Sequence, residues 1–229
     1  MYKYFFKRVL DFFVALLCLP ILLLIFLAVA VAIKIDDKGP VFYVAKRIGR
    51  KGKLFKLIKF RSMKVNAPDI RLSDGSTYNG EDDPRVTKIG KWLRETSIDE
   101  LPQVINVLLG QMSFIGPRPD PEDWIDKYTE EERVFLRVRP GITGYNQAYF
   151  RNNADAKTKI KNDVYYATNC SFVFDVKIFF KTIVTVFKHE NTYKNTSEES
   201  GAREEAEKLR LEIACSEEDE DNENKRIRK

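Results

Sequence analysis

Histidine and cysteine are almost missing from this sequence. Of the 229 residues, one is a histidine, His189, and three are cysteines, at positions 18, 170 and 215. A single histidine argues against a Ser-His-Asp triad, an H-E-x-x-H zinc site or a two-histidine iron site, unless His189 itself is the essential residue. Three cysteines without C-x-x-C spacing support neither a disulfide framework nor a structural zinc site. Any enzymatic chemistry must therefore come from carboxylates, lysines, arginines and a hard metal ion.

The charge is unevenly distributed along the chain. The formal net charge is +5, but residues 195–229 hold twelve acidic and seven basic residues, which leaves 22 acidic and 32 basic residues in the preceding part. A basic body predicts an anionic partner, such as nucleic acid, a phospholipid surface or a phosphorylated small molecule. The acidic segment cannot support a packed core, so we predict a disordered tail that is transiently helical at residues 204–214.

A run of 22 apolar, uncharged residues extends from Phe12 to Ile33. At about 1.5 Å per residue, a helix of this length could cross a hydrocarbon core of about 30 Å. Pro20 lies inside the run, where its missing backbone donor predicts a kink. Basic residues flank both ends of the run, so the positive-inside rule assigns no direction. The residues alone leave two alternatives open: a broken helix that re-enters on the cytoplasmic side, and an ordinary span.

The rest of the body is expected to combine a hairpin with short helices. Residues 41–60 predict a basic β-hairpin, because two β-rich runs flank a turn that contains glycine. A short helix is predicted over residues 88–94, and another begins near Asp99 and stops at Gly110.

Four further segments have distinct patterns. Residues 112–119 are expected to be extended, residues 121–137 to form a helix, and residues 139–144 to form a turn-rich loop. Residues 172–188 predict a helix rich in Phe, Val and Ile, with three lysines on one face. This pattern fits both a helix in the membrane interface and a core helix with one solvated stripe.

Asp99 and Glu100 are the candidate acids. The spacing Ser97-x-x-Glu100 is that of a capping box, and carboxylates favour a helix N-terminus in any case. Pro102 fits better if the helix starts nearer Asp99, which would place Asp99 at the junction, within reach of a substrate. The spacing alone leaves the capping and the functional interpretations open.

Lys59, Arg61 and Arg118 are the candidate cations. Lys59 and Arg61 end the predicted hairpin, and Arg118 stands between Pro117 and Pro119. The two prolines stiffen the backbone that presents Arg118, and a guanidinium can bind two phosphate oxygens at once. A solvated surface is the ordinary alternative for each of these side chains.

Five ordered motifs follow the apolar run, and together they resemble the bacterial sugar transferases, the monotopic phosphoglycosyl transferases that act on polyprenyl phosphate. The resemblance covers roughly residues 1–190, and the order of the motifs makes it specific. The motifs are Lys59-Phe60-Arg61-Ser62-Met63, Asp99-Glu100-Leu101-Pro102-Gln103, Asn106-Val107-Leu108-Leu109-Gly110, Met112-Ser113-Phe114-Ile115-Gly116-Pro117-Arg118-Pro119 and Arg139-Pro140-Gly141-Ile142-Thr143-Gly144.

This resemblance implies a reaction. Members of the family move a sugar 1-phosphate from a UDP-sugar to undecaprenyl phosphate and release UMP, which is the first membrane step of a surface glycan. Their mechanism is ping-pong, with the aspartate of the acidic dyad as nucleophile. By motif match the nucleophile is Asp99 and its partner is Glu100, with Mg²⁺ held by both. The residues implied to bind substrate are Lys59, Arg61, Arg118 and Arg151.

The same resemblance implies an architecture. The fold would be α+β and mainly helical, with a re-entrant membrane helix broken at Pro20, a small antiparallel β-hairpin and interfacial amphipathic helices. The expected division is a membrane helix (1–38), a catalytic domain (39–194) and a charged tail (195–229). The location would be the cytoplasmic face of the bacterial inner membrane. The expected partners are a UDP-sugar, undecaprenyl phosphate, the membrane and a second copy in a homodimer, and not nucleic acid.

The chain departs from its relatives at two places. Leu19-Pro20 stands about one turn before the position where many relatives have Ser-Pro, and Phe150 occupies a glycine position before Arg151. The alternative function, from another class, is a membrane-anchored module whose basic hairpin binds nucleic acid or acidic lipid.

Overall fold

The computed structural model describes residues 2–72, 77–80, 82–151, 154–188 and 204–211. The helices are α1 (Lys7–Asp36), α2 (Lys88–Glu95), α3 (Gln103–Leu108), α4 (Tyr145–Tyr149), α5 (Ala156–Asn169) and α6 (Phe172–Phe187), and a π-helical turn, Tyr2–Phe6, precedes α1. The strands are β1 (Phe42–Ile48), β2 (Leu54–Phe60), β3 (Ser113–Ile115) and β4 (Gly141–Thr143). The predicted mainly helical α+β class is confirmed, as is the short helix over residues 88–94.

Helix α1 is the one helix of the described chain that is long and apolar enough to cross a membrane. One of its faces packs into the protein at three- and four-residue spacing, through Leu22, Phe26, Val29 and Ile33. The opposite face is exposed and equally apolar, with Leu17, Ile21, Leu24, Leu27 and Ile35. A continuous exposed apolar surface of this kind is typical of a membrane contact.

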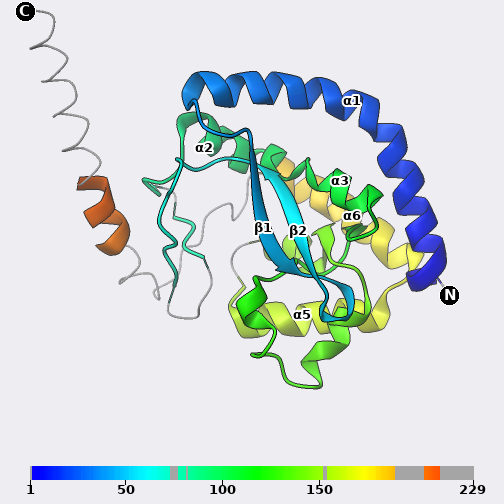
Figure 1. Ribbon diagram of the computed structural model, residues 1–229. Helices are drawn as coiled ribbons and strands as arrows, with labels where there is room; N and C mark the ends of the chain where they lie inside the picture. The colour runs from blue at the N-terminus through cyan, green and yellow to red at the C-terminus, as the bar shows by residue number, and fades with distance from the viewer. Residues whose placement is uncertain (1, 73–76, 81, 152–153, 189–203, 212–229) are drawn as a thin grey trace, which may run out of the picture.

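The helix is bent. Figure 1 shows α1 turning partway along its length, so that it curves around the rest of the protein. Pro20 lies inside the helix, and the chain remains helical on both sides of it. Because proline lacks a backbone N–H and crowds the preceding turn, Pro20 supplies a physical cause for the bend.

Polar contacts fasten the N-terminal end of α1. The Lys7 ammonium donates to Asp175 of α6 at 2.5 Å, and both side chains are buried. Arg8 donates to the carbonyl oxygens of Val107 and Leu108, at 2.6 and 2.8 Å. These carbonyls lie at the end of α3, where the helix leaves few backbone donors; Val107 also accepts from the N–H of Gly110 at 2.9 Å. Helix α1 is therefore held to two elements of the domain.

The predicted hairpin is confirmed. Strands β1 and β2 pair antiparallel, with Phe42 opposite Phe60 and Ile48 opposite Leu54. The Phe60 ring stacks on Phe42 and meets Phe26 of α1 edge-on, at centroid distances of 5.5 and 5.2 Å. Strand β2 also packs against α3. The hairpin thus contacts both α1, through Phe60, and α3, the helix that follows Asp99.

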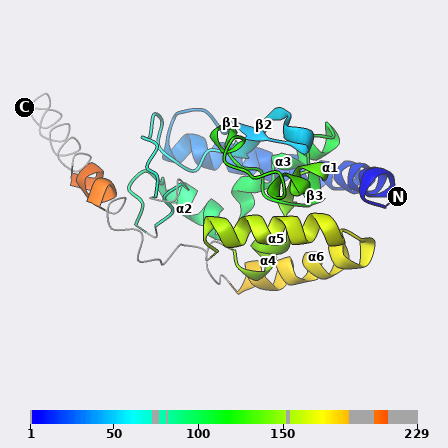
Figure 2. The same cartoon turned by 90° about the horizontal axis from the view of Figure 1, so that it is seen from below.

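Helices α4, α5 and α6 form a second layer. Figure 2 shows them on the side of the molecule away from the hairpin. Of α6, Ile178 is fully buried and Asp175 and Thr185 nearly so, whereas the exposed side carries Phe172, Val173, Phe179, Phe180 and Val184. The interpretation as a core helix with a solvated stripe is therefore wrong, because the exposed side of α6 is the apolar one.

Two local predictions fail. Residues 121–137 do not form one helix but two short 3₁₀ segments, Glu122–Trp124 and Glu132–Arg137. Thr129 and Glu132 exchange hydrogen bonds between side chain and backbone, at 2.9 and 3.3 Å, which starts a new turn there and breaks the helix.

The second failure concerns residues 139–144, which are not all loop. They contain β4, which pairs in parallel with β3. A parallel pair between distant segments leaves no local signal in the sequence, because neither three-residue run has a strand pattern of its own.

Candidate active site

Four of the predicted residues come together from three separate segments. Lys59 Nζ lies 2.8 Å from Glu100 Oε1 and 4.0 Å from Asp99 Oδ2. Arg118 binds Glu100 through both terminal nitrogens, with Nη2–Oε1 at 2.8 Å and Nη1–Oε2 at 3.3 Å. The two candidate acids and two of the candidate cations therefore form one cluster, defined here as the acidic-dyad site.

The acids stand on a 3₁₀ turn, Ile98–Glu100, that precedes α3. Ser97 is left-handed, with φ at 59°, and its side chain caps nothing. The capping-box interpretation is therefore wrong, since Glu100 reaches the two cations instead. Helix α3 begins only after Pro102, so the junction between turn and helix presents both carboxylates.

Asn106 aligns Lys59 with this turn. Its amide donates to the carbonyl of Lys56 at 2.7 Å and accepts from the N–H of Ile58 at 3.1 Å. Asn106 is fully buried in α3, and the two bonds tie that helix to strand β2 just before Lys59. Sequence reasoning missed this role. The available signal was one amide on the apolar face of a predicted helix, where an unpaired polar group would be costly.

The loop that carries Arg118 is built on close backbone contacts. The N–H of Gly116 donates to Thr143, and that of Gly141 donates to the carbonyl of Pro117, both at 2.8 Å. A Cβ on Gly141 would lie 2.1 Å from the nitrogen of Gly116, so glycine is required for this approach. The Gly-Pro-Arg-Pro and Arg-Pro-Gly motifs thus pack against each other through their backbones.

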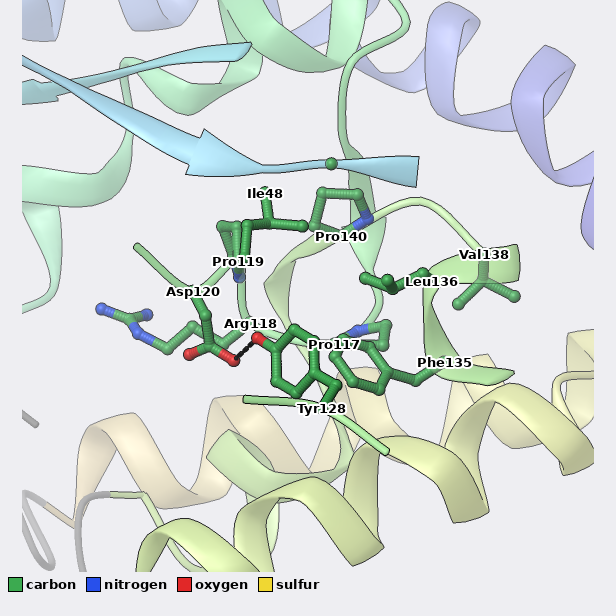
Figure 3. Close-up of a pocket in the computed structure, with 11 residues that line it drawn as sticks. Ile48, Pro117, Arg118, Pro119, Asp120, Tyr128, Phe135, Leu136, Val138 and Pro140 are labelled. Carbon is green, nitrogen blue, oxygen red and sulfur yellow. Dashed lines mark hydrogen bonds between the residues drawn. The ribbon is translucent and has the colours of Figure 1, made fainter. Parts of the chain in front are cut away.

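Figure 3 shows the other side of this loop. A small cavity there is lined mainly by apolar side chains, including Phe135, Leu136 and Val138, and the Arg118 side chain extends away from them. Asp120 accepts from the Tyr128 hydroxyl at 2.7 Å and is paired with Lys159. The cavity and the acidic-dyad site therefore lie on opposite sides of the loop that carries Arg118.

The pKa values of the two acids are shifted in opposite directions. Burial alone would raise the pKa of Glu100, but Arg118 and Lys59 outweigh it and hold that pKa well below its usual range. Burial raises the pKa of Asp99, against the effect of Lys59, and the charge of Glu100 raises it further. Glu100 in turn raises the pKa of Arg118. Glu100 is thus a fixed anion, and Asp99 holds its proton more tightly than a free aspartate.

The remaining predicted residues lie outside this cluster. The Arg61 guanidinium is bound by the carboxylate and carbonyl of Asp37 and by the carbonyl of Pro40, at 2.6 to 2.9 Å, which joins the end of α1 to the hairpin. Arg151 donates to the carbonyl of Glu95 at 3.3 Å. Pro20 lies in α1. His189 falls outside the described residues.

The donor set suits a magnesium ion only in part. No group of three Asp, Glu, His or Cys side chains gathers in the described ranges. Magnesium commonly uses one or two carboxylates and takes its other oxygens from water and substrate phosphates. Asp99 offers such a carboxylate, because its side chain makes no hydrogen bond within the described chain. Both oxygens of Glu100 are engaged, so Glu100 would have to release a cation to bind the ion.

Comparison with known proteins assigns the chain to a family. The family model described as "Bacterial sugar transferase" matches residues 2–189. The chain belongs to the bacterial sugar transferase family. It is 39% identical over 198 residues to the exopolysaccharide production protein ExoY of Sinorhizobium fredii, covering 82% of this chain and 88% of that protein.

Two further relatives have names that state a reaction. The UDP-N-acetylgalactosamine-undecaprenyl-phosphate N-acetylgalactosaminephosphotransferase of Aeromonas hydrophila is 40% identical over 188 residues, which is 80% of this chain and 44% of that protein. The UDP-glucose:undecaprenyl-phosphate glucose-1-phosphate transferase of Escherichia coli is 38% identical over 195 residues, which is 82% of this chain and 41% of that protein. This chain thus spans less than half of these two relatives.

Proposed function

We propose that this protein is a phosphoglycosyl transferase that moves a sugar 1-phosphate from a UDP-sugar to undecaprenyl phosphate and releases UMP. The observation that carries the proposal is the pairing of two unequal carboxylates. Glu100 is occupied by Lys59 and Arg118, whereas the neighbouring Asp99 is buried and has no hydrogen bond from any described residue. A carboxylate without hydrogen bonds keeps its lone pairs available for attack.

The chemistry follows from the cluster in two steps. An oxygen of Asp99 attacks the phosphorus that carries the sugar, and the bond from that phosphorus to the bridging oxygen breaks, so that UMP leaves with the electron pair. A phosphate oxygen of undecaprenyl phosphate then attacks the same phosphorus. The bond to Asp99 breaks, and the carboxylate returns with the sugar now on a lipid diphosphate.

The cations support both steps. Lys59 and Arg118 together carry one more positive charge than Glu100 removes, so the site attracts phosphate oxygens even though Asp99 lies beside it. Glu100 orients both cations and keeps them from collapsing onto Asp99. Mg²⁺ bound by Asp99 and the substrate phosphates would supply further neutralisation of charge.

A location at the membrane suits a lipid acceptor. The exposed apolar face of α1 and the apolar side of α6 give the protein two surfaces of the same character. We assign α1 as a re-entrant helix, bent at Pro20, that enters and leaves on the cytoplasmic face of the inner membrane. Basic residues at both ends of α1 favour one side for both ends.

The test uses purified protein and a UDP-sugar panel without lipid acceptor. With its own donor, the wild type is expected to release about one UMP per active site and to gain the mass of a sugar phosphate on the peptide that contains Asp99. Asp99→Asn should lose both, because an amide cannot attack phosphorus. Glu100→Gln should slow the release strongly, since it loosens both cations.

Two results would contradict the proposal. One is a folded Asp99→Asn protein with normal turnover; the other is a sugar-phosphate adduct on another peptide. A basic binding module, the alternative function, would bind anions with steep salt dependence and show no turnover.

A further inference from the structure

Arg47 is a half-buried arginine that has no acidic partner in the described part of the chain. Two other arginines nearby are paired: Arg118 with Glu100, and Arg71 with Asp69 and Asp123. The Arg47 side chain makes neither an ion pair nor a hydrogen bond with any described residue. Burying a charge without a partner costs free energy that a bound anion would recover.

The strand register places Arg47 on the face of the hairpin that meets the acidic-dyad site. Arg47 pairs with Phe55 and Tyr43 pairs with Lys59, so Arg47 and Lys59 belong to the same face of the hairpin. On that face Phe55 is buried, and Lys59 reaches Glu100. The two positions are roughly 13 Å apart along the strands, at about 3.3 Å per residue.

The Arg118 loop lies alongside Arg47. Arg47 forms a β-bridge with Pro121, and the N–H of Ile48 donates to the carbonyl of Asp120 at 2.9 Å. Burial lowers the pKa of Arg47 and the positive charge of Arg118 lowers it further, against the smaller opposing effects of Tyr43 and Asp120, which form no ion pair with it. The carboxylate of Asp120 is engaged by Tyr128 and Lys159.

We propose that Arg47 binds the phosphate that departs with the nucleoside, beyond the phosphorus that Asp99 attacks. This inference rests on the proposed function, which requires a diphosphate donor and a UMP product. Lys59 and Arg118 hold the phosphate that stays with the sugar, next to Asp99. Arg47, farther along the same face, holds the second phosphate and draws charge toward the leaving group. It is a substrate-binding residue that no motif in the sequence had indicated.

The experiment measures the binding of UMP, and of uridine, to the full-length protein by calorimetry. Arg47→Ala should weaken UMP binding roughly tenfold or more, because a charge-assisted contact to phosphate is lost. The UMP affinity of Arg47→Lys should lie between the affinities of Arg47→Ala and the wild type. Uridine, which lacks the phosphate, should bind all three proteins equally. The matched control is Lys46→Ala, which removes an exposed cation from the same strand on the opposite face.

The outcomes separate this inference from the proposed function. If Arg47→Ala binds UMP as tightly as Lys46→Ala does, the inference is overturned, even where the Asp99 adduct forms. Should Arg47→Ala fail to fold, Arg47→Lys decides in the same way. If Arg47→Ala selectively loses UMP binding but the wild type forms no adduct on Asp99, the role of Arg47 is supported and the covalent mechanism is overturned. Equal losses for UMP and uridine would mean a structural role and overturn the inference.

Discussion

At the residue scale, the acidic-dyad site separates two carboxylates that are neighbours in the chain. Glu100 is an anion with two cations on it, and Asp99 is buried beside it with no hydrogen bond from a described residue. Their environments push the two pKa values apart, which is a common way for one site to give two acids different tasks.

A substitution of Arg118 can separate the effect of its side-chain geometry from the effect of its charge at the acidic-dyad site. Arg118→Lys keeps the charge but loses the fork that binds both oxygens of Glu100. We expect UMP release to fall on the order of 100-fold, a typical cost of one misplaced electrostatic donor. The matched control is Arg137→Lys, at an exposed arginine. A lysine variant with near-normal rates would show that Arg118 is a generic surface cation.

Asp163 makes stability depend on pH. Its carboxyl is buried in α5, and Oδ2 has no hydrogen-bond partner within the described structure. Burial raises the pKa of Asp163 to about 7. Between the ordinary pKa near 4 and this value, the unfolded chain loses the proton while the folded protein keeps it, so stability falls as pH rises through that window.

Asp163→Asn should remove this fall, which amounts to at most about 4 kcal/mol. The measurement is the unfolding free energy at pH 4.5, 6 and 8, with the exposed Asp126→Asn as the control. If the unfolding free energies of the wild type and Asp163→Asn change with pH in parallel, this prediction is wrong.

At the scale of elements, α1 is the helix whose shape bears most directly on function. It is apolar on both the buried and the exposed face, bent, and fastened at its N-terminal end to α3 and α6. A straight helix could not both keep these contacts and follow the domain as Figure 1 shows. The bend at Pro20 is therefore coupled to the way α1 packs on the domain.

Single cysteines at Lys3 and Lys38, in a protein whose native cysteines are replaced, should be labelled from the same, cytoplasmic side. Pro20→Leu should straighten α1, move one label to the opposite side and abolish turnover, because a continuous apolar helix favours crossing. Leu24→Ala, at an exposed position of the same helix, serves as the control. Labels on opposite faces in the protein with Pro20 would establish a span and refute re-entry.

At the scale of the whole molecule, the acidic tail meets the body away from the acidic-dyad site. Within the tail the described residues 204–211 are helical, in agreement with the predicted helix over 204–214. Ala206 is buried against Ile70, Leu72 and Tyr78. The Arg210 guanidinium lies 3.8 Å from Asp82. These contacts are few, and none involves the acidic-dyad site.

A protein that ends near Asn195 should therefore keep most of its turnover. We also expect a small loss of stability, about 1 kcal/mol, from exposing the apolar cluster around Tyr78. The measurements are UMP release and thermal unfolding, with Ala206→Glu in the full chain as the control for the loss of that contact alone. A folded, truncated protein without turnover would reveal a catalytic role for the tail.

The sequence by itself determined most of the local elements and pointed to the residues that form the acidic-dyad site. The apolar run predicted α1, alternation and glycines predicted the hairpin, and the ordered motifs identified Lys59, Asp99, Glu100 and Arg118. These features depend on backbone preferences and residue types, which act over a few residues. At Ser97 the local pattern left two explanations open, and over residues 121–137 it predicted one helix where the structure has two short 3₁₀ segments.

Only the tertiary structure decided which residues share a site. Arg61 follows Lys59 by two positions, yet it binds Asp37, while Arg118 crosses the fold to meet Glu100. The parallel contact between β3 and β4 and the bonds of Asn106 to β2 also depend on segments far apart in the chain, as do the surroundings of Arg47, which has no ion-pair partner among the described residues. The physical reason is that burial and pairing are properties of packed neighbours, and neighbours in space are not encoded by spacing along one element.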